Sequence, residues 1–396
     1  MIENRKIRIL VLIDYYLPGY KAGGPLRTLA NMVERMSDEY EFWIVTRDRD
    51  FGDNQPYADV CLGEWVDQGL AKVFYVPKAQ WGVWRMRELL SETQYDILYL
   101  NSFFSWWGTG IPLLLRRLHR ARSVPVVIAP RGEFSQGALR LKAFKKQVYI
   151  FLTRWVGLYK GLIWQASSKH EVDDIANQRI VERRRVLVAK NVLVAPDLLP
   201  DMQIAPVGAV AAERAVGPLR LVFISRISSK KNLDFLLRTL QRVSNPVELA
   251  IYGPREDVGY WTSCQELIRA LPSNVKVDVG GQVPHEEIRT VFGQHDIFVF
   301  PTRGENFGHV IFEALAAGTP VLVSDQTPWE SDAHSGLRTL PLNEEQWRVA
   351  IESWAALQPT ELLERRFAAL AYSAAYLAKD DSLLRNKALF QAALEP

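Results

Sequence analysis

Apolar and polar positions follow two different periods along this chain, and the two periods alternate. Short runs rich in Val, Ile, Leu and Phe have the length of a buried strand, and between them apolar residues recur every three or four positions, as on an amphipathic helix. This alternation is typical of parallel α/β sheets. In the first half, the expected strands are residues 7–13, 41–46, 72–76, 97–100, 124–129 and 162–166, and the expected helices are residues 25–36, 84–93, 109–121 and 143–159.

The pattern is lost over residues 197–218, where Pro, Ala and Gly follow one another without periodicity, and we interpret this stretch as a linker. A second α/β alternation follows it, and the chain is then expected to be helical from Glu344 onward. We therefore predict two domains, residues 1–200 and 201–396, with a ligand cleft beyond the carboxyl ends of their strands. In the second domain, the expected strands are residues 219–224, 247–251, 275–279, 297–300 and 320–323, and the expected helices are residues 233–243, 260–270, 286–292 and 310–317.

Length and composition agree with this division. The 396 residues are too many for one typical core, and 48% hydrophobic with 23% charged residues is ordinary for a globular protein. Cys61 and Cys264 lie far apart with no metal-ligand spacing, which disfavours a disulfide framework or a zinc site and favours a reducing cytoplasm. The first apolar run is too short for a signal peptide, and no run reaches the roughly 18 residues of a membrane span.

One acidic residue stands inside an otherwise apolar helix. Glu313 lies within residues 310–317, where an unpartnered buried carboxylate would be costly. A second acid, Glu305, precedes it by eight residues, and Gly308 lies between them at the helix start. Two carboxylates beside free backbone N–H groups suit a polyhydroxylated, phosphorylated ligand, which indicates a nucleotide-sugar site. Alternatively, Glu313 is held in a buried ion pair and Glu305 caps the helix.

Two cations follow the first strand of the second domain. Arg226 and Lys231 lie in the loop before the next helix, for which Asn232 is the expected N-cap. Two positive charges beside a helix N-terminus form a clamp for a diphosphate. The alternatives are a solvated surface pair or partners for Glu313.

Adjacent glycines follow the first strand of the chain. Gly23 and Gly24 precede the helix at residues 25–36 and would let a phosphate or sugar approach the backbone closely, although a tight turn explains them equally well. The surrounding sequence matches neither the Walker pattern nor G-x-G-x-x-G, so a P-loop ATPase or a Rossmann dehydrogenase is disfavoured.

In order and spacing these motifs resemble the retaining glycosyltransferases of family 4, and the resemblance covers nearly the whole chain. It implies the GT-B fold: two Rossmann-like parallel-sheet α/β domains facing each other across a cleft, the first binding acceptor and the second donor, with C-terminal helices packing back toward the first. The loops at residues 129–134 and 325–329 are similar to the bacterial polysaccharide branch. The segments that carry the resemblance are Gly23-Gly24, Ser225-Arg226 with Lys231-Asn232, and residues 305–321.

The resemblance also implies roles for residues. Glu305 would hold the transferred sugar, while Arg226 and Lys231 would neutralise the departing diphosphate, and these three are the expected catalytic residues. Glu313 would bind the ribose. The other implied donor-binding residues are Gly23, Gly24, Gly253, Val283, Asn306, Phe307 and Gly308. The implied contacts to the donor sugar or acceptor are Asn101, Arg131, Glu133 and His309. Relatives often have histidine at the position of Asn101. His309 is equally well an ordinary helix-start residue.

Neither a metal nor another cofactor is expected. Fixed positive charge stabilises a departing diphosphate without one, and the single Asp-x-Asp, Asp48-Arg49-Asp50, looks like a charged surface turn. No carboxylate is placed on the reacting face of the sugar, which favours same-face attack over a covalent intermediate.

Residues 134–170 contain no acid but seven lysines and arginines interleaved with aromatic residues. This composition suits an anionic bilayer surface, with a solvated basic face as the alternative; nothing else supports a nucleic-acid partner. We therefore expect a cytoplasmic enzyme, peripheral on the inner face of the membrane. It would move sugar from a UDP- or GDP-linked donor to a lipid-linked glycan in exopolysaccharide, O-antigen or lipopolysaccharide biosynthesis. The alternatives are a non-catalytic nucleotide-sugar-binding scaffold, or an epimerase or phosphorylase of the same fold.

Overall fold

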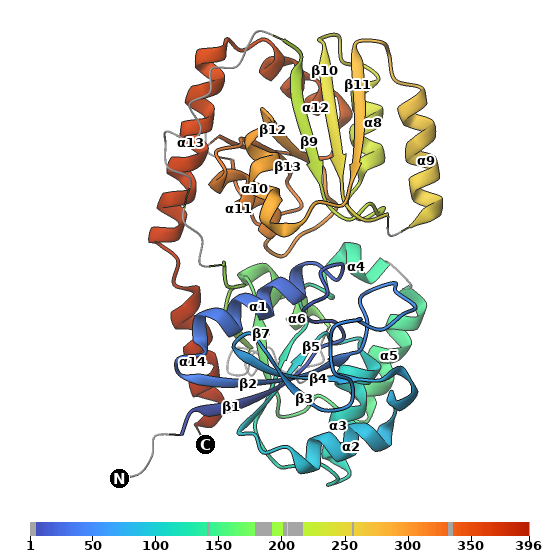
Figure 1. The fold of residues 1–396 in the computed structure, drawn as a ribbon, viewed down its shortest axis with the longest axis vertical. Helices are drawn as coiled ribbons and strands as arrows, with labels where there is room; N and C mark the ends of the chain where they lie inside the picture. Colours follow the sequence, from blue (N-terminus) through green and yellow to red (C-terminus); the bar gives the residue numbers. More distant parts are fainter. Residues whose placement is uncertain are drawn as a thin grey trace. The chain divides into compact units, whose positions relative to one another are not determined.

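The chain folds into two compact units, each built around one sheet (Figure 1). The first comprises Met1–Asp201 together with Asp381–Pro396, and the second comprises Met202–Asp380. The C-terminal segment thus belongs to the first unit, whereas the expected boundaries assigned it to the second. The computed structural model describes residues 5–140, 143–178, 192–200, 204, 217–255, 257–331 and 336–395, so most of the expected linker lies outside the described residues.

The sheet of the first unit has the order β3-β4-β2-β1-β5-β6-β7-β8, and every neighbouring pair is parallel except the β3–β4 hairpin. Its strands are β1 (Ile7–Leu12), β2 (Tyr40–Arg47), β3 (Trp65–Gln68), β4 (Ala71–Val76), β5 (Ile97–Asn101), β6 (Val126–Ala129), β7 (Ile163–Ala166) and β8 (Val192–Val194). Its helices are α1 (Gly24–Met36), α2 (Val83–Glu92), α3 (Ile111–Arg117), α4 (Gln136–Arg140), α5 (Ala143–Trp155), α6 (Lys169–Asn177) and α14 (Ser382–Leu394), with a 3-10 turn at Lys78–Gln80 and a π-turn at Trp106–Gly110.

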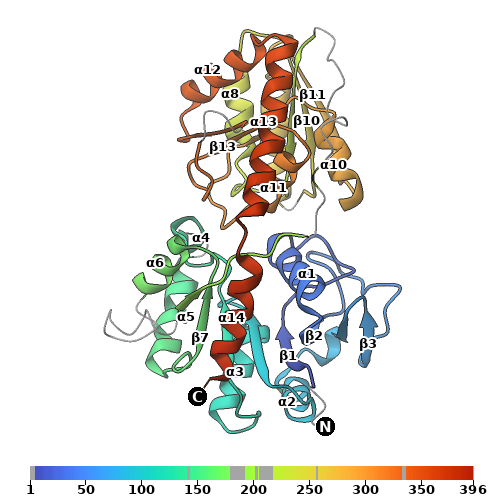
Figure 2. The same ribbon diagram turned by 90° about the vertical axis from the view of Figure 1, so that its left-hand side faces the viewer.

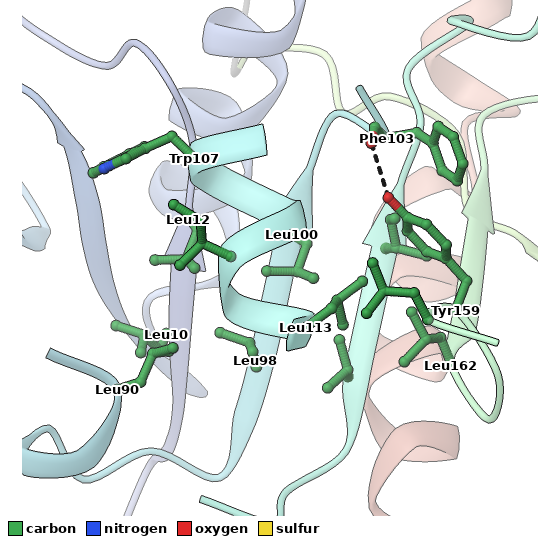
Figure 3. Packing of buried hydrophobic residues seen from close by; sticks show 14 of the residues in the cluster. Leu10, Leu12, Leu90, Leu98, Leu100, Phe103, Trp107, Leu113, Tyr159 and Leu162 are labelled. Carbon is green, nitrogen blue, oxygen red and sulfur yellow. Dashed lines mark hydrogen bonds between the residues drawn. The ribbon is translucent and has the colours of Figure 1, made fainter. Parts of the chain in front are cut away.

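Side chains alternate along the central strands and divide the core of this unit into two layers. On one face, Leu10 and Leu12 of β1 pack with residues of α2, α3 and the π-turn, and the Tyr159 hydroxyl donates to the Phe103 carbonyl at 3.0 Å (Figure 3). On the other face, Ile9 and Val11 pack with α1 and α14. The α14 helix contacts α1, β5 and β6 (Figure 2), so the C-terminal segment completes the second layer.

The second unit holds a fully parallel sheet in the order β11-β10-β9-β12-β13-β14. The order reverses between β9 and β12, and loops at such a switch point often hold ligands. The strands are β9 (Leu219–Ile224), β10 (Val247–Tyr252), β11 (Val275–Gly281), β12 (Ile297–Phe300), β13 (Val321–Ser324) and β14 (Leu337–Leu340). The helices are α8 (Leu233–Leu240), α9 (Val258–Arg269), α10 (His285–Gly293), α11 (His309–Ala316), α12 (Glu344–Ala355) and α13 (Pro359–Ala378).

Every strand expected from the sequence is present, and three short strands, β3, β8 and β14, were not predicted. The stretch from Glu344 is helical, as expected, and it is divided into three helices, α12, α13 and α14. Pro359 begins α13 at a position where its missing N–H is harmless, and Gln358 forms a capping box with Glu361. Among the described residues, no helix has both the length and the apolar character needed to span a bilayer.

Candidate active site

The loop between β9 and α8 carries the predicted cations and is held in place by its own backbone. Ile227 N donates to the Pro254 carbonyl at 2.8 Å, and Lys231 N donates to the Ser228 carbonyl at 2.9 Å. The pKa of Lys231 is lowered by burial and by the nearby positive charges of Lys230 and Arg226, with Glu305 acting in the opposite sense. The predicted pair of cations is therefore part of a group of three.

Asn232 occupies the expected N-cap position of α8, but its side chain does not cap the helix. Its φ of 64° is left-handed, whereas a capping side chain normally requires an extended backbone. Its Nδ2 instead donates to the Pro301 carbonyl at 2.9 Å, and its Oδ1 accepts from Arg303 Nε at 3.0 Å. The expected cap is thus wrong, and Asn232 links the β9–α8 loop to the loop after β12.

Lys231 and Glu305 form a buried ion pair, although 74 positions separate them in sequence. Their side chains are only 11% and 13% exposed, and Thr302 Oγ1 donates to the same Glu305 oxygen at 3.1 Å. They meet because β9 and β12 are neighbours in the sheet. Burial raises the pKa of Glu305, but the positive charges of Lys231 and Lys230 and these hydrogen bonds outweigh it and hold the pKa below its ordinary value. The carboxylate is therefore charged.

The glycines before α11 shape the loop that carries Glu305. Gly304 has φ of 155° and Gly308, the N-cap of α11, has φ of 80°. The Glu305 carboxylate bonds Lys231 and Thr302 and, among the described residues, accepts from no backbone N–H of the first turn of α11, so the alternative that Glu305 caps this helix is wrong. Glu305 N donates to the Gln326 carbonyl at 3.1 Å, which fixes the loop against the segment after β13.

Glu313 lies on the less buried face of α11. Ile311, Phe312 and Leu315 are fully buried, whereas Glu313 and His309, which are four residues apart and share a face, are half-buried. The expectation that this helix is buried all round is therefore wrong, because one stripe remains partly open. Glu313 is therefore partly accessible to solvent.

An aromatic cluster supports the loop and α11 from behind. The rings of Phe307, Phe312, Trp329 and Tyr376 lie with centroids between 5.1 and 6.5 Å apart, and Trp329 Nε1 donates to the Phe307 carbonyl at 2.5 Å. Trp329 belongs to the segment that resembled the polysaccharide branch. The sequence does not predict this role for Trp329, because the spacing between Trp329 and α11 does not indicate that they pack against each other. Asn306 and Val283, both half-buried, lie in the loops before α11 and α10.

Gly253 follows β10 and has a structural reason to be glycine. Its φ is 136°, and a Cβ there would lie 1.9 Å from the Ser225 carbonyl oxygen. Its backbone N–H donates to the Gly281 carbonyl at 2.6 Å. The residue therefore holds the ends of β9, β10 and β11 together, whatever ligand they bind.

We expect Gly253→Ala to destabilise the second unit by about 3 kcal/mol or more, because backbone must shift and a disfavoured φ must be kept. Urea unfolding followed by circular dichroism measures this. Gly259→Ala is the matched control: Gly259 lies in α9, and a Cβ there makes only an ordinary 3.5 Å contact, so the variant should be unchanged or slightly more stable. Equal stability of both variants would contradict the close-approach argument.

In the first unit, Gly23 is the left-handed N-cap of α1, with φ of 76°. Gly24 differs from it, because a Cβ built on Gly24 meets no atom within 4 Å. The backbone in front of α1 is therefore open at Gly24, as a site for close approach of a ligand requires. A tight turn explains Gly23 but leaves Gly24 without a structural reason.

Because the resemblance implies that the donor's phosphate approaches Gly24, we expect Gly24→Ala to leave thermal stability unchanged while weakening donor binding about tenfold. Calorimetric titration with nucleoside diphosphate sugar, beside a melting curve of the same sample, measures both. Unchanged affinity would remove Gly24 from the donor site.

Asn101 and Arg131 are joined inside the first unit. Asn101 ends β5 and is 2% exposed. Its Oδ1 accepts from Arg131 Nε at 3.2 Å, whereas its Nδ2 is buried without a hydrogen-bond partner among the described residues. Arg131 also donates to the Tyr99 hydroxyl at 2.6 Å and pairs with Asp197. Arg131 is thus committed to internal partners.

Glu133 is likewise occupied by its own unit. It accepts from Ser102 Oγ at 2.6 Å and from the backbone N–H groups of Phe103 and Phe104 at 2.5 and 3.1 Å. Burial raises the pKa of this carboxyl above its ordinary value. Glu133 therefore clamps the loop after β5, a role that its position in sequence did not indicate.

The Asp48-Arg49-Asp50 motif is buried, which corrects the expected surface turn. Asp48 binds Arg49 in a two-point ion pair, with oxygen–nitrogen distances of 2.8 and 3.0 Å. Asp50 accepts from the backbone N–H groups of Tyr20, Lys21 and Phe51. Both carboxylates thus close loops. Within the described ranges, no group of three or more His, Cys, Asp or Glu side chains is placed to hold a metal ion.

Comparison with known proteins gives a family match within the second unit. Residues 211–354 match the family described as Glycosyl transferases group 1. This match covers most of the second unit. This confirms the family-level resemblance drawn from the motifs around Arg226 and Glu305.

Similar sequences include an uncharacterised glycosyltransferase of Methanocaldococcus jannaschii, 30% identical over 106 residues, which are 26% of this chain and 26% of that protein. The O-antigen chain mannosyltransferase RfbU of Salmonella typhimurium is 29% identical over 124 residues, 31% of this chain and 35% of RfbU. The chain thus spans about a quarter to a third of the length of these relatives.

Similar folds cover both units. Sucrose-phosphate synthase from Thermosynechococcus elongatus gives a TM-score of 0.69 at 13% identity, over 98% of each chain. The HepE protein of Anabaena, in complex with UDP-glucose, gives 0.67 at 16% identity, over 97% of this chain and 98% of that one. The fold is therefore GT-B, as the sequence predicted.

Proposed function

We propose that the chain transfers a sugar from a nucleoside diphosphate sugar to a glycan acceptor with retention of configuration, without a metal ion. The observation that supports this most directly is the buried Lys231–Glu305 pair, fixed where β9 and β12 end within the group 1 glycosyltransferase region. A charged carboxylate beside a group of cations suits a substrate that is neutral at its sugar and anionic at its diphosphate.

In this proposal the bond between the anomeric carbon and the phosphate oxygen breaks, and its electron pair stays with the phosphate. Lys231 and Arg226 stabilise that developing charge, and Glu305 hydrogen-bonds sugar hydroxyls and stabilises positive charge on the ring. The acceptor oxygen bonds to the anomeric carbon from the same face, and its proton passes to the departing phosphate. Glu313 holds the ribose, with Gly23, Gly24, Gly253, Val283, Asn306, Phe307 and Gly308 completing the donor site.

The wider context is also proposed. The name of RfbU concerns an O-antigen chain, and the HepE structure holds UDP-glucose, which together support a nucleotide-sugar donor and a polysaccharide acceptor. We propose a lipid-linked glycan acceptor in exopolysaccharide, O-antigen or lipopolysaccharide biosynthesis, used by a peripheral protein on the inner face of the cytoplasmic membrane.

One experiment tests the proposal. The chain is titrated by calorimetry with UDP, GDP and their common sugar conjugates, and release of free nucleoside diphosphate from each bound donor is followed with and without EDTA. We expect one base to bind and its sugar conjugate to be slowly hydrolysed, equally with and without EDTA. Binding without cleavage or transfer supports a scaffold, and a donor recovered with one inverted hydroxyl supports an epimerase; either result would refute the proposed transfer.

A further inference from the structure

The α5 helix, which lies in the first unit (Figure 1), carries an unusual row of exposed apolar side chains. Phe144 and Trp155 are each 81% exposed, Phe151 is 67% exposed, and Leu152 and Val148 are 52% and 41% exposed. A surface helix normally presents polar residues to water and keeps its apolar stripe for the core. Here the apolar stripe faces outward, which indicates a surface that is covered in use.

Helical geometry gathers these residues into one line. At 3.6 residues per turn, Phe144, Phe151 and Trp155 fall within about 40° of one another around the helix axis, with Val148 beside them. Lys145 and Arg154, both exposed, lie about 80–100° away on opposite sides of the line. An apolar ridge with cations along both flanks is the pattern of a helix that lies in the plane of a bilayer interface.

The opposite face holds α5 to the unit. Thr153 is buried, and Tyr149 hydrogen-bonds Tyr159, a buried residue beyond the helix, at 2.9 Å between hydroxyl oxygens. Tyr149 and Ile150 pack against the core layer that contains Phe103. The ridge is therefore presented by a helix whose other side is already packed.

The charge around α5 identifies the partner. Between Ile97 and His170, Glu133 is the only acidic residue against twelve lysines and arginines, of which Arg131 is paired inside the unit, whereas the whole chain carries a net charge of +3. Glu133 is occupied by the loop after β5, and Arg117 Nη1 donates to the Gly157 carbonyl at 3.4 Å, which places a basic helix end beside the end of α5. The surface is thus both apolar and strongly cationic.

We infer that α5 is the membrane-docking element of this protein, with Phe144, Phe151 and Trp155 inserted into an anionic bilayer and the flanking cations on its headgroups. A second copy of the chain fits less well, because a symmetric contact through α5 would oppose two basic surfaces. This inference deepens the proposed function and rests on it for one point, the reason why the protein would dock on a membrane. It adds that α5 is the helix that docks, and that insertion of apolar side chains, not charge alone, holds the protein there.

The test uses the full chain and three variants. We measure how much of each protein sediments with vesicles, at low and at high salt. One set of vesicles contains phosphatidylcholine alone, and the other contains phosphatidylcholine and phosphatidylglycerol in equal parts. The ridge variant combines Phe144→Ser, Phe151→Ser and Trp155→Ser. The matched control is Trp84→Ser, which removes a 79% exposed tryptophan from α2. The charge variant combines Lys145→Glu and Arg154→Glu. Melting curves check that all variants fold, as expected for exposed positions.

We expect wild type and Trp84→Ser to bind the anionic vesicles, and the ridge variant to bind them at least about tenfold more weakly. The charge variant should no longer prefer the anionic vesicles over vesicles of phosphatidylcholine alone. Wild-type affinity in the ridge variant would overturn the inference. Two other results would also overturn it. One is a wild-type protein that does not bind vesicles and forms a dimer in solution, with the ridge variant monomeric. The other is a wild-type protein that binds single-stranded nucleic acid but not vesicles.

The same preparations are assayed with donor and a water-soluble acceptor. The ridge variant should keep wild-type donor hydrolysis, because its three residues belong to no part of the candidate active site. Vesicle binding is measured without donor. A wild type that docks through α5 but neither binds nor cleaves a nucleoside diphosphate sugar therefore refutes the proposed function and supports the docking surface.

Discussion

Glu305→Gln should lower the rate of sugar transfer by about a hundredfold or more while leaving affinity for the free nucleoside diphosphate unchanged or slightly higher. The amide keeps the shape of the side chain but removes the negative charge that would stabilise positive character on the sugar ring. It also releases Lys231 from its ion pair, which makes that ammonium more available to phosphate. Single-turnover kinetics with saturating donor, and calorimetric titration with nucleoside diphosphate, measure the two quantities.

A control separates this effect from general loss of charge. Glu345 forms an exposed ion pair with Arg348 in the same unit, and Glu345→Gln should leave both quantities unchanged. Transfer at the wild-type rate in Glu305→Gln would remove Glu305 from the reaction. Equal loss of transfer and nucleotide binding would instead make it a residue that shapes the whole pocket.

Lys231→Met is expected to act on both stability and binding. Loss of the ammonium leaves the Glu305 carboxylate buried without its cation, which should lower the free energy of unfolding by about 3–5 kcal/mol. The same loss removes a charge from the diphosphate clamp, so affinity for nucleoside diphosphate should fall at least about tenfold. Urea unfolding and calorimetric titration measure the two effects on one preparation.

The double variant Lys231→Met with Glu305→Leu distinguishes a structural pair from a catalytic one. Apolar residues of similar volume can replace a buried ion pair at little cost, so most of the lost stability should return. Transfer and nucleotide affinity should not return. A double variant that regains transfer would show that the pair only holds the loops, and Lys231→Met with wild-type nucleotide affinity would refute the clamp.

The sequence indicated which loops form the site but not how their side chains are shared. Periodicity located β9 and β12, and the acids and cations after these strands were recognisable by type. That Lys231 pairs with Glu305 and not with Glu313 depends on the neighbouring order of two strands and on a left-handed Asn232, and neither follows from local pattern. Asn232 was misread for this reason, since its residue type suits a cap and only its backbone angle prevents one.

Polar residues were misjudged where they serve the backbone. The sequence suggests a ligand contact for Glu133 and a surface turn for Asp48 and Asp50. In the structure, each of these carboxylates accepts a hydrogen bond from a backbone N–H group of a loop. A carboxylate in a loop gives the same sequence signal whether it meets a ligand, water or its own chain, and only the positions of the donors decide among these. The exposed apolar row on α5 could not be predicted for a related reason. The spacing of its apolar residues predicts a helix but does not indicate which face of the helix packs against the core.

The helix at the C-terminal end of the described chain has a consequence for how the protein is made. Leu389 and Phe390 complete a core layer with Tyr40, Tyr99 and α1, so this layer joins residues that are synthesised far apart in time. During synthesis one apolar face of the sheet therefore lacks the cover of α14 until translation has passed Asp381. The second unit, synthesised later but contiguous, can mature before it.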